Sequence, residues 1–205
     1  MNCQYTQLEQ ESLLHIMGPD TLKFLQGQTT CDTRTVKPNH AVPGVFCTPQ
    51  GRVVCDFLLC ELGLHHFALR MRRDIRASSS TAFGKYIIFS KAQLDATRED
   101  WTPVAVWGLE AANALREIFD AVPTKRFEAT AGEGFVLVQM DELGQQFECY
   151  LHDTTSLARM KEVIPLGTEA AWQALQSALK LVEPLARFAL AGGFRAAGTF
   201  GSLLT

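Results

Sequence analysis

Residues 17–32 read MGPDTLKFLQGQTTCD, the pattern of a strand end, a short helix and a polar loop. The Gly-Pro-Asp at 18–20 can open the helix, because proline suits a first helical turn and an aspartate complements the positive helix end. The apolar run stops near Gln26, and Gly27 leads into uncharged polar side chains and Asp32. Two interpretations stay open. These side chains cap and solvate the helix end, or they border a pocket for a polar, planar ligand.

Apolar periodicity around this stretch predicts alternating strands and helices. In the first half, strands are expected at 12–17, 42–47, 52–61 and 66–71, a helix at 74–86, and extended segments at 87–89 and 91–95. In the second half, strands are expected at 103–107, 135–140 and 147–152, and helices at 109–119, 153–163 and 168–182. The order is therefore β-α-β-β-(β)-α in the first half and β-α-β-β-α in the second. It predicts an α+β fold of two related, ferredoxin-like units with antiparallel sheets and helices on one face.

The expected units span residues 1–95 and 96–182, followed by an atypical tail at 183–205 that is rich in Ala, Gly, Phe and Leu. The composition is that of an ordinary soluble domain, with 47% apolar residues, 20% charged residues and a net charge of −3. The sequence contains no apolar run of about 18 residues, so no membrane span is predicted. The N-terminal residues show no targeting pattern, so we expect a cytoplasmic location.

The overall charge gives no reason to expect nucleic-acid binding, which usually requires a basic excess. A local basic patch stays open as an alternative to a solvated strand end and helix start. Its members would be Arg70, Arg72, Arg73 and Arg76.

None of the six cysteines lies in a C-x-x-C pair, and no Cys/His spacing matches a common zinc site. We expect reduced thiols that serve mainly as small core residues, and no metal site. His65 and His66 should point to opposite faces of a strand, which disfavours joint metal ligation. The common nucleophile, phosphate-loop and metalloprotease motifs do not occur, so no catalytic residue is predicted.

The hairpin at 47–57, CTPQGRVVCDF, places one carboxylate, Asp56, inside an apolar strand. By strand alternation Asp56 shares a face with Leu58 and Cys60, so we expect it to point to an interior or a cleft. A buried aspartate has to be paired or neutralised. Asp56 either pairs with an arginine such as Arg52 or hydrogen-bonds a ligand nitrogen.

Three segments together resemble the folate-binding YgfZ family, which belongs to the superfamily of the glycine-cleavage T-protein. They are residues 18–32, the hairpin strand GRVVCDFLL at 51–59, and KYIIFSK at 85–91. A fourth segment, GQQFECY at 144–150, is similar to a superfamily segment in which a glutamate can hold the pterin end of folate. The order and spacing of the motifs also match. The resemblance is good over residues 10–120 and loose over residues 121–165.

The resemblance implies the T-protein folate-binding fold, a ring-like α+β arrangement with a central opening of folate size. It implies that the protein binds tetrahydrofolate or a derivative and assists the assembly or repair of iron–sulfur proteins, with effects on tRNA modification. Iron–sulfur proteins would be partners, without direct nucleic-acid contact. The implied ligand contacts are Asp56 near the folate nitrogens, Glu148 at the pterin, Gln26, Gln28 and Asp32 at the pocket border, and Arg52 at the glutamate tail.

Two departures from the family pattern bear on activity. The T-protein hairpin carries two adjacent aspartates, whereas this chain has Cys55-Asp56, which argues against aminomethyl transfer. The YgfZ segment K-G-C-Y-x-G-Q-E, with its reactive cysteine, does not occur, so chemistry that needs this cysteine is expected to fail. Two alternatives therefore remain beside a folate-binding assistant: a folate-dependent aminomethyltransferase, and a non-catalytic scaffold with a vacant folate pocket.

Overall fold

The computed structural model describes residues 2–152 and 154–177. The chain divides into two compact units, Met1–Glu169 and Ala170–Thr205. Residues 169–177 are helical, as predicted for 168–182. The rest of that helix, the first residue of the helix predicted at 153–163 and the tail at 183–205 lie outside the described residues. No helix in the described part of the chain is long and apolar enough to cross a membrane.

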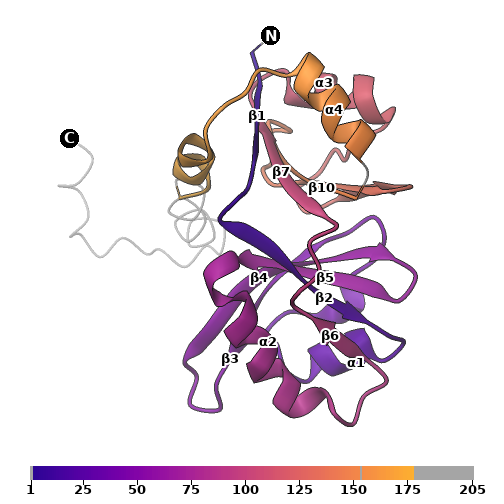
Figure 1. Cartoon of the computed structure of the whole chain (residues 1–205), viewed down its shortest axis with the longest axis vertical. Coiled ribbons are helices and arrows are strands. Elements are labelled where there is room, and N and C mark those ends of the chain that lie inside the picture. Colours follow the sequence, from indigo (N-terminus) through magenta and orange to yellow (C-terminus); the bar gives the residue numbers. More distant parts are fainter. Residues whose placement is uncertain (1, 153, 178–205) are drawn as a thin grey trace, which may run out of the picture. The chain divides into compact units, whose positions relative to one another are not determined.

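The first sheet is antiparallel and five-stranded, with the order β3-β4-β5-β2-β6. Its strands are β2 (Glu11–Met17), β3 (Val42–Cys47), β4 (Val53–Gly63), β5 (His66–Arg72) and β6 (Gln93–Asp95). The helices α1 (Thr21–Gln26) and α2 (Arg73–Ile87) lie on one face of it, and the short 3-10 helix η1 (Thr33–Thr35) follows α1 (Figure 1). Phe24 and Phe83 of the two helices pack there against inward side chains of the sheet such as Leu14, Leu59 and Leu69.

The second sheet is also antiparallel and five-stranded, with the order β1-β7-β10-β9-β8. Its strands are β1 (Gln4–Gln7), β7 (Thr102–Trp107), β8 (Ala129–Gly132), β9 (Phe135–Gln139) and β10 (Gln146–Leu151). The helices α3 (Ala111–Phe119) and α4 (Thr154–Val163) pack on one face of it (Figure 1). The buried positions of α3 recur at helical spacing, which is why this segment folds as an amphipathic helix. They are Ala111, Ala114, Leu115, Ile118 and Phe119.

A glycine with positive φ joins the first central strand of each sheet to its helix. Gly18, between β2 and α1, has a φ of 134°, and Gly108, between β7 and α3, has a φ of 123°. A side chain at either position would collide with backbone, because a Cβ atom would lie 2.2 Å from the Lys91 carbonyl oxygen or 2.3 Å from that of Asn2. Only glycine fits both the conformation and the space.

The α+β class and the antiparallel sheets predicted from the sequence are confirmed. The extended segment predicted at 87–89 is wrong, because α2 continues to Ile87 and a turn follows at 88–89. The strands β1 and β8 and the helix η1 were not predicted. β1 pairs with β7, so the N-terminal strand belongs to the second sheet. The domain boundaries at 95 and 182 remain predictions.

Candidate functional site

The first sheet carries a polar row on the face opposite α1 and α2. Directly paired residues of antiparallel strands share a face, and the pairs Glu11–Arg72 and Leu13–Arg70 place Glu11 and Arg70 on neighbouring strands of this row. Leu14, one position along β2, points instead into the core with the helices. Arg70 therefore projects from the centre of the sheet, away from the helices that cover its other face.

Arg70 joins the two sheets through an ion pair with Glu148 of β10. Its Nε donates to Glu148 Oε2 at 2.8 Å, and its Nη2 donates to Oε1 at 2.7 Å. The Tyr150 hydroxyl donates to the same Oε2 at 2.7 Å, and Arg70 Nη1 lies 3.4 Å from Glu11 Oε2. We call Glu11, Arg70, Glu148 and Tyr150 the central polar cluster. In this cluster one guanidinium bridges two carboxylates that come from different sheets.

Burial governs the electrostatics of the cluster. The Glu148 side chain is 1% exposed, whereas those of Arg70 and Glu11 are 20% and 18% exposed. Burial raises the pKa of Glu11, Arg70 opposes this shift, and the neighbouring Glu148 adds to it. Burial and the Glu148 carboxylate also raise the pKa of Tyr150 well above its usual value. The tyrosine therefore stays a protonated donor, and burial favours the protonated form of Glu11.

The predicted site residue Glu148 is held by the protein itself. Its carboxylate accepts three hydrogen bonds, so a ligand donor has to share an oxygen atom with Arg70 or Tyr150. Glu11, with one longer contact to Arg70, is the less committed acceptor. No sequence pattern singled out Glu11 or Tyr150. Their role depends on strand register, although a tyrosine two residues after Glu148 on one strand had to share its face.

The basic patch considered at residues 70–76 is neutralised by acidic side chains. Besides the Arg70 ion pairs, Arg72 pairs with Asp74 at 2.7 Å and Arg73 pairs with Glu99 at 3.1 Å. Arg76 also pairs with Glu99. These arginines therefore stabilise strand and helix ends through ion pairs. This agrees with the interpretation of residues 70–76 as a solvated strand end and helix start, and not as a basic patch.

Asp56 lies on the polar face of the first sheet and is exposed, which contradicts an interior position, whereas its place in a cleft stays a prediction. β4 pairs with β5 only from Leu58 onward, and at Asp56 its paired neighbour is Val45 of β3. This overhang leaves the carboxylate uncovered. Asp56 is nevertheless near enough to contribute to the raised pKa of Glu11, so the structure brings it close to the central polar cluster.

The remaining predicted residues lie at the end of α1 and at the β3–β4 turn. Gln26 Oε1 accepts from the Thr33 backbone N–H at 2.8 Å and from its hydroxyl at 2.9 Å. Asp32 pairs with Arg34 at 2.7 Å, and hydrogen bonds from Arg34 lower the pKa of this carboxyl. These contacts are of the capping kind that the sequence left open. Gln28 is half-buried, and Arg52 is exposed at the hairpin turn.

The six cysteines are free thiols, and all are buried except the half-buried Cys47. Burial raises the pKa of Cys55, Cys60 and Cys149, so these thiols stay protonated near neutral pH. No group of His, Cys, Asp or Glu residues that could hold a metal ion occurs in the described part of the chain. His65 lies in the turn between β4 and β5 with a φ of 55°, so the expected alternation of His65 and His66 along one strand does not occur. His66 contacts His15 of β2, with 2.9 Å between its Nε2 and His15 Nδ1.

Comparison with known proteins identifies the family of the chain. Residues 3–138 match the family model of the GCVT N-terminal domain. The tRNA-modifying protein YgfZ of Serratia proteamaculans is 27% identical over 183 residues, which cover 83% of this chain and 55% of the relative. An uncharacterized protein of Haemophilus influenzae is 31% identical over 105 residues, covering 51% of this chain and 37% of the relative. The chain thus spans about half the length of the curated relatives that it matches.

Among solved structures, aminomethyltransferase T of the glycine cleavage system of Bartonella henselae superposes with a TM-score of 0.65. The two chains are 14% identical, and the match covers 78% of this chain and 46% of the other. This likeness concerns the fold. Because the family model spans well over half of the sequence, the chain belongs to the GCVT N-terminal domain family, with YgfZ proteins as distant homologues.

Proposed function

We propose that this chain binds tetrahydrofolate or a related reduced folate, and that it assists tRNA modification through the maintenance of iron–sulfur proteins. Its family membership supports the folate ligand, and its similarity to tRNA-modifying YgfZ proteins supports the role in tRNA modification. In this proposal the two sheets are the related, ferredoxin-like units of the T-protein folate-binding fold. The observation that carries it is the central polar cluster, which presents carboxylates from both sheets.

The chemistry of the cluster fits a pterin. A pterin edge offers several N–H donors beside acceptor atoms, so it is best bound by carboxylates next to donor groups. Glu148 and Glu11 supply the acceptors, the guanidinium of Arg70 supplies the donors, and the Tyr150 hydroxyl holds the Glu148 carboxylate in place. When bound, tetrahydrofolate supplies nitrogen atoms that can accept a one-carbon unit. The protein's own part is to hold the pterin edge at Glu148 and Glu11, with Asp56 near the folate nitrogens.

The residues outside the cluster have lesser roles in this proposal. Gln26, Gln28 and Asp32 border the pocket through the loop that they brace. Arg52, exposed at the hairpin turn, attracts the carboxylates of the folate glutamate tail. Removing any one of them should weaken binding less than removing a contact of the pterin.

Calorimetric titration of the reduced protein with tetrahydrofolate, under anaerobic conditions, tests the proposal. Asp56→Ala should weaken binding by about 1–3 kcal/mol if its carboxylate bonds the ligand. Asp56 is exposed, so the variant should stay folded. Glu133→Gln removes one exposed carboxylate from the β8–β9 turn and is the matched control, expected to bind like the unaltered protein. Equal affinities for both variants would remove Asp56 from the site.

The scaffold with a vacant pocket is the second candidate, and one observation favours it. Glu148 already has three donors within the protein, which is how a pocket satisfied by its own side chains would look. A folded sample that gives neither heat nor a thermal shift with tetrahydrofolate would support this candidate. Aminomethyl transfer is less well supported, because Cys55 is 2% exposed and packs in the core below α2, on the opposite strand face from Asp56.

A further inference from the structure

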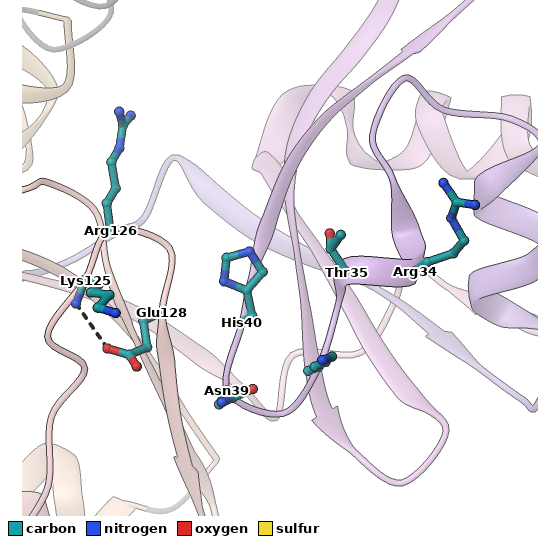
Figure 2. Close-up of a pocket in the computed structure, with 8 residues that line it drawn as sticks. Arg34, Thr35, Asn39, His40, Lys125, Arg126 and Glu128 are labelled. Carbon is teal, nitrogen blue, oxygen red and sulfur yellow. Dashed lines mark hydrogen bonds between the residues drawn. The ribbon is translucent and has the colours of Figure 1, made fainter.

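A cavity of about 490 Å³ lies where the loop after α1 meets the turn before β8, apart from the residues of the central polar cluster. Figure 2 shows Arg34 and Thr35 on one side, Lys125, Arg126 and Glu128 on the other, and His40 between them. Basic side chains dominate its lining, and we call this cavity the basic pocket. Its lining residues are Arg34, Thr35, Lys37, Asn39, His40, Lys125, Arg126 and Glu128.

Backbone hydrogen bonds fix the two walls of the basic pocket to each other. The Ala41 N–H donates to the Phe127 carbonyl at 2.8 Å, and the Ala129 N–H donates to the Asn39 carbonyl at 2.8 Å. His40 and Glu128 form an antiparallel bridge between these bonds. Phe127 adopts a φ of 61°, a conformation that non-glycine residues seldom take outside functional or tightly constrained sites. Lysines and arginines from distant parts of the sequence are therefore held around one space.

The acidic groups near the basic pocket are already engaged. The Glu128 carboxylate accepts from the Thr124 N–H at 2.7 Å and from the Lys125 N–H at 3.1 Å, and these bonds lower its pKa. Asp32 forms an ion pair with Arg34. The same ion pair neutralises Arg34, so the lining holds Lys37, Lys125 and Arg126 against one carboxylate, Glu128, in a protein whose net charge is −3. A local excess of positive charge in a concave site selects anions.

The kinds of donor in the basic pocket point to phosphate. Guanidinium, ammonium, hydroxyl and amide groups are the side chains that contact phosphates in nucleic-acid complexes. Apart from the His40 imidazole, no ring is among the described residues that line the pocket, so it offers no platform on which bases or a pterin would stack. Cations on both walls suit a ligand with several anionic groups. We propose that the basic pocket binds the phosphate groups of a polyphosphate or of an RNA strand.

Two probes distinguish the sources of phosphate. The full chain is titrated with sodium tripolyphosphate and with a fluorescein-labelled oligouridylate of about ten nucleotides, at about 50 and 150 mM salt. The test variant is Lys37→Ala/Lys125→Ala, which removes two exposed ammonium groups and leaves the backbone bonds of the walls in place. The matched control is Lys85→Ala/Lys91→Ala, which removes two exposed lysines that do not line the pocket.

We expect the test variant to bind at least about 10-fold more weakly and the control to change less than about 2-fold. The slope of log affinity against log salt should fall by about 2 units in the test variant with the RNA. Binding of RNA alone assigns the pocket to a strand, and binding of tripolyphosphate alone assigns it to a compact polyphosphate. No binding of either probe, or equal losses in both variants, would overturn the proposal. The tetrahydrofolate affinity of the test variant should be unchanged, so failure here leaves the folate proposal standing.

Discussion

The two sheets of this protein are built on the same plan from dissimilar sequences. In each, a strand leads into a glycine whose N–H donates to a carbonyl just before the fourth strand of the motif, Gly18 to His65 before β5 at 2.8 Å and Gly108 to Gln145 before β10 at 2.9 Å. In each, the acidic residue two positions after the glycine accepts a hydrogen bond from a backbone N–H just before the edge strand of the sheet. Asp20 accepts from Lys91 at 2.9 Å, and Glu110 accepts from Asn2 at 2.9 Å.

The edge strands complete the correspondence. β6 pairs with β2 in the first sheet, and β1 pairs with β7 in the second, so the strand orders match position by position. The two halves differ in the polar side chains on the sheet face that the helices do not cover. Arg70 lies five residues after His65, and Tyr150 lies five residues after Gln145, at the same place in the plan. Both donate to Glu148, which only the second half supplies. The central polar cluster therefore needs both halves.

The largest expected effect comes from breaking the pairing between the halves. Arg70→Met leaves the Glu148 carboxylate buried without its cation, which should lower the free energy of unfolding by about 3–5 kcal/mol. Urea denaturation measures this loss. The double variant Arg70→Met/Glu148→Leu replaces the pair with apolar side chains and should regain most of the stability. A double variant as unstable as Arg70→Met would show that the loss comes from packing rather than from the unpaired charge.

The shared turn predicts matched losses at its two glycines. Gly18→Ala and Gly108→Ala each force a side chain into a positive-φ position against a backbone carbonyl, and each should cost about 2–3 kcal/mol. Gly84→Ala is the control, because α2 leaves open space there and alanine is the better helix former. It should raise stability by about 0.5–1 kcal/mol. If only one of the two glycines tolerates alanine, the two turns are not equivalent.

A buried histidine in the first half, which the second half lacks, should make the stability of the protein depend on pH. His15, three residues before Gly18, corresponds to the buried Ala105 of the second sheet. Burial lowers the pKa of His15 from 6.5 to about 4, and His66 and Arg98 add to the shift while Asp95 and Asp100 oppose it. Between these pKa values the unfolded chain takes up the proton first, so stability present at neutral pH is lost as the pH falls.

This loss should amount to about 2 kcal/mol between about pH 6.5 and 4. His15→Ala, which copies the residue of the second sheet, should flatten the dependence, although it lowers stability at neutral pH through the cavity that it leaves. Denaturation of both proteins across this range provides the comparison. Parallel curves for the two proteins would contradict the assignment to His15.

The smallest effect concerns the second donor to Glu148. Tyr150→Phe removes one hydrogen bond and keeps the ion pair, so it should cost about 1 kcal/mol. Comparing this loss with that of Arg70→Met ranks the two equivalent positions by their contribution to stability. We expect the charged donor, Arg70, to contribute more than the neutral donor, Tyr150. Thermal denaturation of the two variants in the same buffer shows the order, and a larger loss for Tyr150→Phe would reverse it.

Much of the fold was accessible from the sequence because it rests on local patterns. The strand at 42–47 was predicted with its observed bounds, since apolar runs between turn residues are strong local signals. β1 was missed because its four residues, QYTQ, carry almost no apolar signal, and its burial comes from β7, which lies far away in the sequence. The wrong extended segment at 87–89 reflects β-branched residues at a helix end, where tertiary context outweighs propensity.

The candidate site shows the same limit. Glu148 was predicted through its motif, but its partner Arg70 lies 78 residues away, so their pairing depends on how the two sheets meet. The Asp56 face was predicted from alternation, whereas its exposure depends on where β5 stops covering β4, which no local pattern encodes. Residue types could therefore be chosen from the sequence, but their partners could not.

Anaerobic calorimetric titration with tetrahydrofolate, comparing the unaltered protein with Arg70→Met/Glu148→Leu, tests the central claim most directly. The double variant keeps the fold but lacks the acceptor and donor that the two halves share. We predict micromolar binding to the unaltered protein and its loss in the folded double variant. No heat from the folded unaltered protein, or equal affinity in the double variant, would contradict a folate site at the central polar cluster.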